Sequence, residues 1–189
     1  MENQNQLTPT ESLKVISEAI NQTKENIKDQ SFYYIMWGWL ISIASFTHYV
    51  LLFKDFKQSY LPWLILMPIG WIVSITYAMK KEKSLKYETY LDVFLKNLWI
   101  VIGISFIGII FISSSLKVNP TSFILLLAGI GTLVSGLTMK FKPLSIGGIM
   151  LFIFSIVSLF VGNSETLLVN GIAIIFGYLI PAYLLKKSK

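Results

Sequence analysis

The feature that most constrains this chain is the placement of its charges, which leaves six long stretches without any Asp, Glu, Lys or Arg. These uncharged runs are residues 30–53, 58–79, 97–116, 118–139, 143–164 and 166–185. An α-helix rises about 1.5 Å per residue, so roughly 20 apolar residues cross the hydrocarbon core of a bilayer. Each run meets that length, and none is long enough for two crossings. The sequence therefore predicts six transmembrane segments.

Each segment is expected to be a helix, because a chain in hydrocarbon must satisfy its own backbone hydrogen bonds. A transmembrane barrel would need strands of about ten residues with alternating polarity, whereas these runs are apolar on all sides. We predict an all-α, multi-pass bundle, with a cytoplasmic tail over residues 1–30 and a membrane domain over residues 31–189. Its spans are expected near residues 32–53, 60–79, 97–115, 120–139, 143–162 and 166–185.

The lysines predict the orientation, since cytoplasmic segments of membrane proteins carry an excess of basic residues. Of the 16 lysines, 13 lie in the two tails, in 80–96 and in 140–142, and three lie in the loops on the other side. Both termini are therefore expected in the cytoplasm. The membrane is expected to be the plasma (inner) membrane of a bacterium, because the chain is rich in Ile, Lys, Phe and Asn and lacks Arg. The lipid bilayer is then the expected environment, and nucleic acid is not expected as a partner.

Residues 8–29 are expected to form an amphipathic helix. Thr8 suits the N-cap, Pro9 suits the first helical position, and Glu11 completes a capping box. An apolar stripe follows at spacings of three and four residues, and consists of Leu13, Ile16, Ile20, Thr23 and Ile27. The acidic balance of this segment argues against an anionic lipid surface. Docking against this chain's own loops, binding of a protein partner and self-pairing into a homo-oligomer remain open; we predict docking against 80–96 or a basic partner.

The stretch 81–96 is predicted to be a cytoplasmic extension of the third membrane helix. Glu82 with Lys86, and Asp92 with Lys96, place an acid four residues before a base, which is the favourable order on a helix. A solvated loop is the alternative interpretation.

Small residues on the fourth and fifth spans indicate close helix packing. Gly136 and Ser135 lie on one side of the fourth span, and Gly147 and Gly148 begin the fifth. The turn between these spans is so short that they are expected to be antiparallel neighbours. Pro68 and Pro181 lie inside runs, where proline is expected to kink a helix.

Polar groups within the predicted spans are few. No charged residue lies within a run, which disfavours ion-coupled transport, because such transporters usually keep an ionisable residue at depth. The polar candidates for a functional site are His48 and Asn170, with interhelical hydrogen bonding as the alternative role. Aromatic residues near span ends, including Tyr34 and Trp99, are expected at the headgroup level, and the deeper Trp71 is expected between helices.

No catalytic, cofactor-binding or metal-binding residue is predicted. A zinc site needs three or four His, Cys or acidic ligands, and the chain has one His and no Cys. The G-x-S-x-G pattern of a serine nucleophile is absent, as is the Arg that phosphate chemistry usually employs. We therefore expect no cofactor and no enzyme activity.

Three stretches support a resemblance that spans most of the chain. They are YYIMWGWLISIASFTHYVLL (33–52), GIGTLVSGLTMKFKPLSIGGI (129–149) and GYLIPAYLLK (177–186), which resemble a family of uncharacterised small six-helix bacterial membrane proteins. The last motif departs from the family pattern, with Ala182 in place of glycine. The resemblance implies a six-helix inner-membrane protein and supplies no site residues.

Two functions are consistent with these features. The first is a non-enzymatic interaction or regulatory component that uses its cytoplasmic helices and small-residue faces. The alternative is a small permease for a neutral or weakly polar solute. A pocket lined by His48, Asn170 and Trp71 would favour the permease, and a solidly packed bundle would favour the interaction protein.

Overall fold

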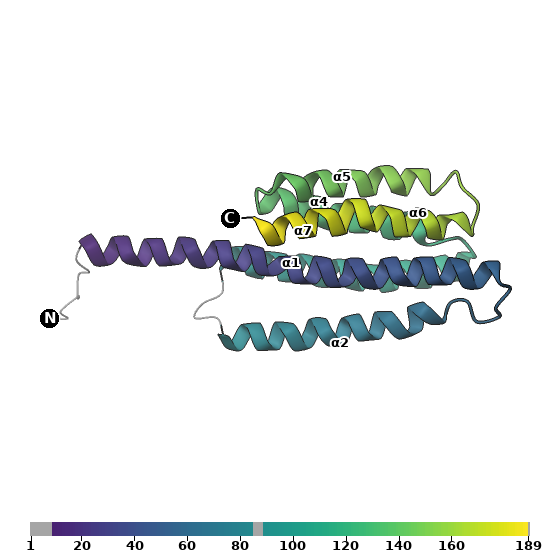
Figure 1. Ribbon diagram of the computed structural model, residues 1–189, viewed down its shortest axis with the longest axis horizontal. Coiled ribbons are helices and arrows are strands. Elements are labelled where there is room, and N and C mark those ends of the chain that lie inside the picture. Colours follow the sequence, from purple (N-terminus) through teal and green to yellow (C-terminus); the bar gives the residue numbers. More distant parts are fainter. Residues whose placement is uncertain (1–8, 85–88, 189) are drawn as a thin grey trace.

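The computed structural model describes residues 9–84 and 89–188, and all regular structure in these two ranges is helical (Figure 1). In chain order the elements are α1 (Pro9–Phe53), α2 (Leu61–Ser84), α3 (Tyr90–Leu116), α4 (Thr121–Thr138), α5 (Lys142–Val157), α6 (Glu165–Ile174), the π-helical turn η1 (Ile175–Leu179) and α7 (Ile180–Lys187). α6, η1 and α7 follow one another without a break and form one long helix. The predicted all-α class is confirmed for the described residues.

Five helical segments of the described chain are long and apolar enough to cross a membrane. They are Asp29–Phe53, Leu61–Lys81, Tyr90–Leu116, Thr121–Thr138 and Glu165–Lys187. α5 has only 16 residues, which gives about 24 Å at 1.5 Å per residue and falls short of a hydrocarbon core of about 30 Å. The span predicted over 143–162 is therefore shorter as a helix. α5 ends at Val157, and the backbone continues as turns in which Leu159 and Phe160 each bond the carbonyl oxygen three residues back.

α1 is one uninterrupted helix of 45 residues, about 68 Å long and far longer than one crossing needs. The sequence has neither Pro nor Gly between Thr10 and Trp37, so nothing breaks the helix where it leaves the bundle. The predicted amphipathic helix and the first predicted span are thus a single element. Figure 1 shows its first turns projecting beyond the ends of the other helices. We call residues 9–28 the α1 extension; Thr8, the predicted N-cap, lies outside the described residues.

The stretch 81–96 does not form the single extension of the third span that was predicted. Lys81–Ser84 belong to the end of α2, and α3 begins at Tyr90. Thr89 has an extended backbone and caps α3 with Asp92 in a reciprocal capping box, so the helix cannot be continuous through Thr89. The two acid–base pairs that suggested one helix lie on opposite sides of this cap in the sequence, Glu82 with Lys86 before it and Asp92 with Lys96 after it.

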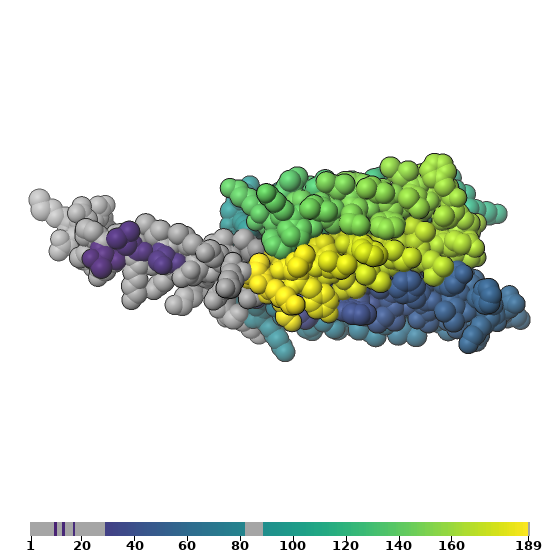
Figure 2. Space-filling model, turned by 45° about the horizontal axis from the view of Figure 1, so that its top comes forward, coloured from purple at the N-terminus to yellow at the C-terminus, as the bar shows by residue number. Residues whose placement is uncertain are grey.

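Successive helices run in opposite directions, and α1 lies between α2 and the α6–α7 segment. α1 contacts α2 on one side and α6, η1 and α7 on another; α5 contacts α4, η1 and α7, and α3 contacts α4. In Figure 2 the yellow α6–α7 segment lies between α5 and α1. The start of α1 and the end of α7 lie at the same end of the bundle (Figure 1).

Glycines bring α4, α5 and η1 into backbone contact, as their positions predicted. A methyl group added to Gly136 would overlap the backbone of Ser145, and one added to Gly147 would overlap the carbonyl oxygen of Gly177. Such close approach is typical of helices that pack in lipid, where small residues let the backbones meet. α4 and α5 are the antiparallel neighbours that the short turn implied.

The two internal prolines have different consequences. Proline lacks the N–H that an α-helix uses and crowds the carbonyl one turn back. Before Pro181 the chain widens into η1, where Ile180 N–H bonds the carbonyl oxygen of Ile175, five residues earlier. Pro68 lies within α2, which runs on to Ser84.

Candidate functional site

His48 joins α1 to the start of α2. The indole N–H of Trp63 donates a hydrogen bond to Nδ1 of His48 over 3.0 Å. The bond closes the loop between the two helices, at the end of the bundle opposite the α1 extension. His48 therefore makes an interhelical hydrogen bond, and a functional role for it stays a prediction.

Asn170 joins α6 to α1 in the interior. Its side chain is 5% exposed and donates through Nδ2 to Ser45 Oγ over 2.7 Å. Its Oδ1 atom is buried and has no hydrogen-bond partner among the described residues. The amide thus acts as an interhelical contact with one acceptor left over.

The three residues predicted to line a pocket each have a different neighbour among the described residues: His48 bonds Trp63, Asn170 bonds Ser45, and Trp71 packs on Trp37. Trp71 lies against Trp37, with ring centroids 5.8 Å apart, and against the backbone of Gly103 on α3. It packs between helices as predicted, although it remains 44% exposed. A shallow hollow of about 310 Å³ lies elsewhere, on α3, and is lined by Tyr90, Val93, Phe94, Asn97, Leu98 and Val101.

An aromatic cluster at the centre of the bundle was missed by the sequence analysis. Tyr34 of α1, Trp99 of α3 and Tyr178 of η1 pack together, with ring centroids 4.9 to 6.1 Å apart. Tyr34 is 2% exposed, so its ring packs inside the bundle; its expected depth at the headgroup level stays a prediction. The sequence did carry a signal for the burial of Tyr34, because Tyr34 is in helical register with the apolar stripe of the α1 extension.

Four interior hydroxyls are buried without a well-aligned hydrogen bond among the described residues, although those of Tyr34 and Ser135 lie close enough to interact. They belong to Tyr34, Ser42, Thr132 and Ser135. Other interior hydroxyls do join helices: Ser122 and Ser158 lie 2.6 Å apart, and Ser155 donates to the carbonyl oxygen of Ser122 over 2.7 Å. The interior thus offers neutral hydrogen-bonding groups, and within the described residues no three His, Cys, Asp or Glu side chains gather as a metal site requires.

With the geometry described, the chain was compared with known proteins. No protein-family model, curated protein or solved structure matches it. The resemblance to small six-helix bacterial membrane proteins accordingly stays a prediction.

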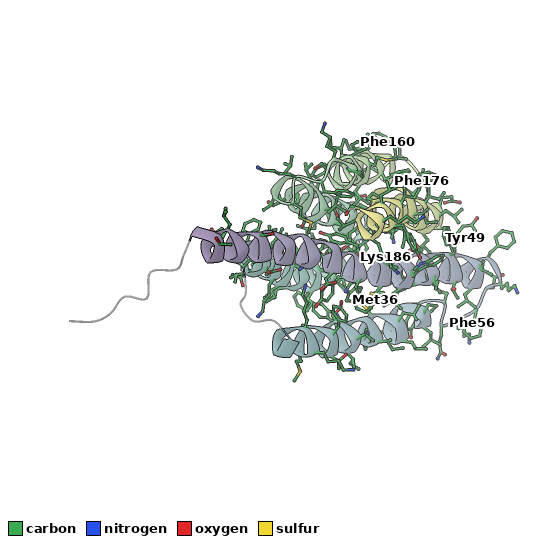
Figure 3. All side chains as sticks on the ribbon, turned by 60° about the vertical axis from the view of Figure 1, so that its left-hand side comes forward. Met36, Tyr49, Phe56, Phe160, Phe176 and Lys186 are labelled. Atoms are coloured by element: carbon green, nitrogen blue, oxygen red, sulfur yellow. The ribbon has the colours of Figure 1, made fainter. Side chains whose placement is uncertain are left out.

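The end of the bundle from which α1 projects carries two distinct features. Asp29 of α1 pairs with Lys81 of α2 at 3.5 Å, beside a stack of Phe32 on Tyr77 with centroids 4.0 Å apart. The second feature is a group of four exposed lysines at this end, which lie on the α4–α5 turn and on α7. These lysines, which we call the basic end, are Lys140, Lys142, Lys186 and Lys187; Lys186 is labelled in Figure 3.

The α1 extension stands clear of this end. Leu13 is the one apolar member of the predicted stripe whose side chain the structure describes, and it is 68% exposed. In Figure 2 the described side chains of the extension, drawn in purple, lie away from the bundle. An exposed leucine on a projecting helix is a surface that another molecule can cover.

Proposed function

We propose that this chain is a non-enzymatic membrane protein that binds a protein partner through the α1 extension. The observation that carries the proposal is the continuity of α1, because the residues of the predicted apolar stripe belong to the same uninterrupted helix that enters the bundle. Each Leu or Ile that a partner buries contributes about 1.5–3 kcal/mol. A stripe of four such residues therefore offers a partner apolar surface whose burial favours binding.

The proposal includes six crossings with both termini in the cytoplasm. The 13-to-3 lysine distribution supports this orientation. α5 supports the sixth crossing, because it runs antiparallel along α4 and its short helix is extended by the turns that follow Val157. In this orientation the α1 extension and the basic end both face the cytoplasm.

A permease for a neutral or weakly polar solute is the second candidate. The observation that favours it is the presence of buried hydroxyls without a well-aligned hydrogen bond among the described residues, on Tyr34, Ser42, Thr132 and Ser135, which could hydrogen-bond a neutral solute. Swelling of protein-containing vesicles in solutions of small neutral solutes tests this function. Swelling no faster than that of empty vesicles would exclude it.

Binding by the α1 extension is tested by cross-linking from single thiols, since the chain contains no cysteine of its own. Leu13→Cys places a thiol on the stripe, and Glu18→Cys places the matched control on the opposite face of the helix. A short thiol-to-amine cross-linker applied in cells should give one discrete adduct from position 13 and none from position 18. The adduct should disappear when Ile16→Asp and Ile20→Asp are added. Equal adducts from both positions, or none from either, would contradict the proposal.

A further inference from the structure

The apolar stripe is in register with the face of α1 that enters the bundle core. Leu13, Ile16, Ile20, Thr23 and Ile27 precede Tyr34 by 21, 18, 14, 11 and 7 residues. At about 3.6 residues per turn these separations are close to six, five, four, three and two whole turns. Because α1 is uninterrupted between these positions, the stripe continues the line of Tyr34 outside the membrane.

That line leads onto α6, η1 and α7. Tyr34 packs on Tyr178 with centroids 4.9 Å apart, and four residues later Gly38 lies against the side chain of Leu179. Ser45, three turns beyond Tyr34, bonds Asn170. A different line of α1 faces α2, through Tyr33 against Tyr77 and Trp37 with Ser74. The stripe is therefore aligned with α7 and not with α2, the helix that leads into the segment 80–96.

This register excludes pairing of two copies through the stripe. Copies in one membrane share an orientation, so two paired extensions would run parallel with their stripes facing each other. Each stripe lies above its own α7, and the axes of packed helices are 8–10 Å apart. The α1 of one copy would then enter the membrane where the other copy already has α7. A partner helix without a membrane span at that point meets no such obstacle.

The basic end lies at the end of the bundle from which the stripe projects. Gly147 of α5 contacts Pro181 of α7; Lys142 is five residues before this contact and Lys186 five residues after it. Since the two helices are antiparallel, both lysines lie about 7.5 Å beyond the contact, at the same level. Within the described residues, no ion pair involves any of the four lysines of the basic end.

We propose that the stripe and the basic end together form one docking site for an amphipathic helix of a protein partner. The partner helix lies along the stripe for about four turns, because residues 13 to 27 cover about 21 Å. Acidic side chains at its membrane-proximal end meet Lys142, Lys186 and their neighbours. This inference rests on the proposed function and specifies the partner's chemistry and its position above α7.

The test uses the full-length protein in nanodiscs of zwitterionic lipid. The probe is a designed fluorescent helix of about 20 residues with a leucine stripe and three Glu at one end, and its control carries three Lys in their place. The acidic probe should bind at least tenfold more tightly than the basic one. Lys142→Glu with Lys186→Glu should weaken acidic-probe binding at least tenfold, and Ile16→Asp with Ile20→Asp should do the same. Lys54→Glu with Lys57→Glu, the same charge change at the other end of the bundle, should leave it unchanged.

Three results would overturn the inference. Equal binding of the two probes would show that the basic end is not part of the site. An equal loss of acidic-probe affinity in the Lys54/Lys57 control would show the same. Rapid disulfide-linked dimer formation by Ile20→Cys would show that a second copy covers the stripe. Cross-linking from Leu13→Cys in cells tests the proposed function separately. An adduct there requires a partner on the stripe but no contact with the basic end, so it can persist when the role of the basic end is refuted.

Discussion

Replacing Gly136 with alanine is expected to destabilise the bundle, whereas the same change at Gly108 should stabilise it. The added methyl at Gly136 overlaps the backbone nitrogen of Ser145 and lies 2.7 Å from its Oγ atom. Because the obstruction includes backbone, α5 must shift away from α4. At Gly108, on α3, an added methyl has no atom within 4 Å.

The two variants form a matched pair whose difference isolates the packing cost. In each, alanine favours the helix over glycine by roughly 0.5–1 kcal/mol. This gain cancels in the comparison and leaves the overpacking at Gly136, which costs about 1–3 kcal/mol. Gly136→Ala should therefore be less stable than Gly108→Ala by about 1–3 kcal/mol.

The free energy of unfolding is measured by titrating SDS into detergent micelles and following tryptophan fluorescence. Gly136→Ala should unfold at a lower SDS fraction than the wild type, and Gly108→Ala at the same or a higher fraction. If the two variants unfold together, α4 and α5 do not meet in backbone contact at this point, and the packing argument fails.

Two further substitutions test the interhelical hydrogen bonds in the same assay. Trp63→Phe keeps an aromatic ring, although a smaller one, and removes the N–H that donates to His48; loss of this hydrogen bond should cost about 0.5–1.5 kcal/mol. No loss of stability would show that the bond contributes nothing. A double-mutant cycle of Asn170→Ala and Ser45→Ala should give a coupling energy of about 0.6–1.7 kcal/mol. Additive effects of the two changes would mean that the side chains do not interact.

The membrane-spanning character of the chain was predictable because it depends on local composition. Uncharged runs of sufficient length predict helices whatever packs around them, and five of the described helical segments meet the criterion. The exception is α5, a helix of 16 residues that begins at Lys142, although the uncharged run that predicted it has 22 residues. The length of an uncharged run gives only the maximum length of the helix within it. Here the helix ends earlier, because the backbone continues as turns after Val157.

The interior could be predicted only in part, because it depends on which helices become neighbours. The small residues of α4 and α5 predicted close packing, since a short turn already made these helices adjacent. Tyr34 could not be assigned by its distance from the span end, because its burial requires Trp99 and Tyr178 from two distant segments. His48 and Asn170 can be recognised from the sequence as polar residues within apolar runs, but their partners Trp63 and Ser45 follow only from the packed arrangement.

The most direct test of the account is the topology of single thiols in intact cells, since a six-crossing bundle that presents the α1 extension to the cytoplasm requires one pattern only. Cysteines replace Leu13, Lys57, Lys142 and Asn163 one at a time in the cysteine-free chain, and a membrane-impermeant maleimide is added from outside. Thiols at 57 and 163 should react in intact cells, and those at 13 and 142 only after the membrane is opened. Labelling at position 13 in intact cells, or its absence at position 163 until lysis, would contradict the account.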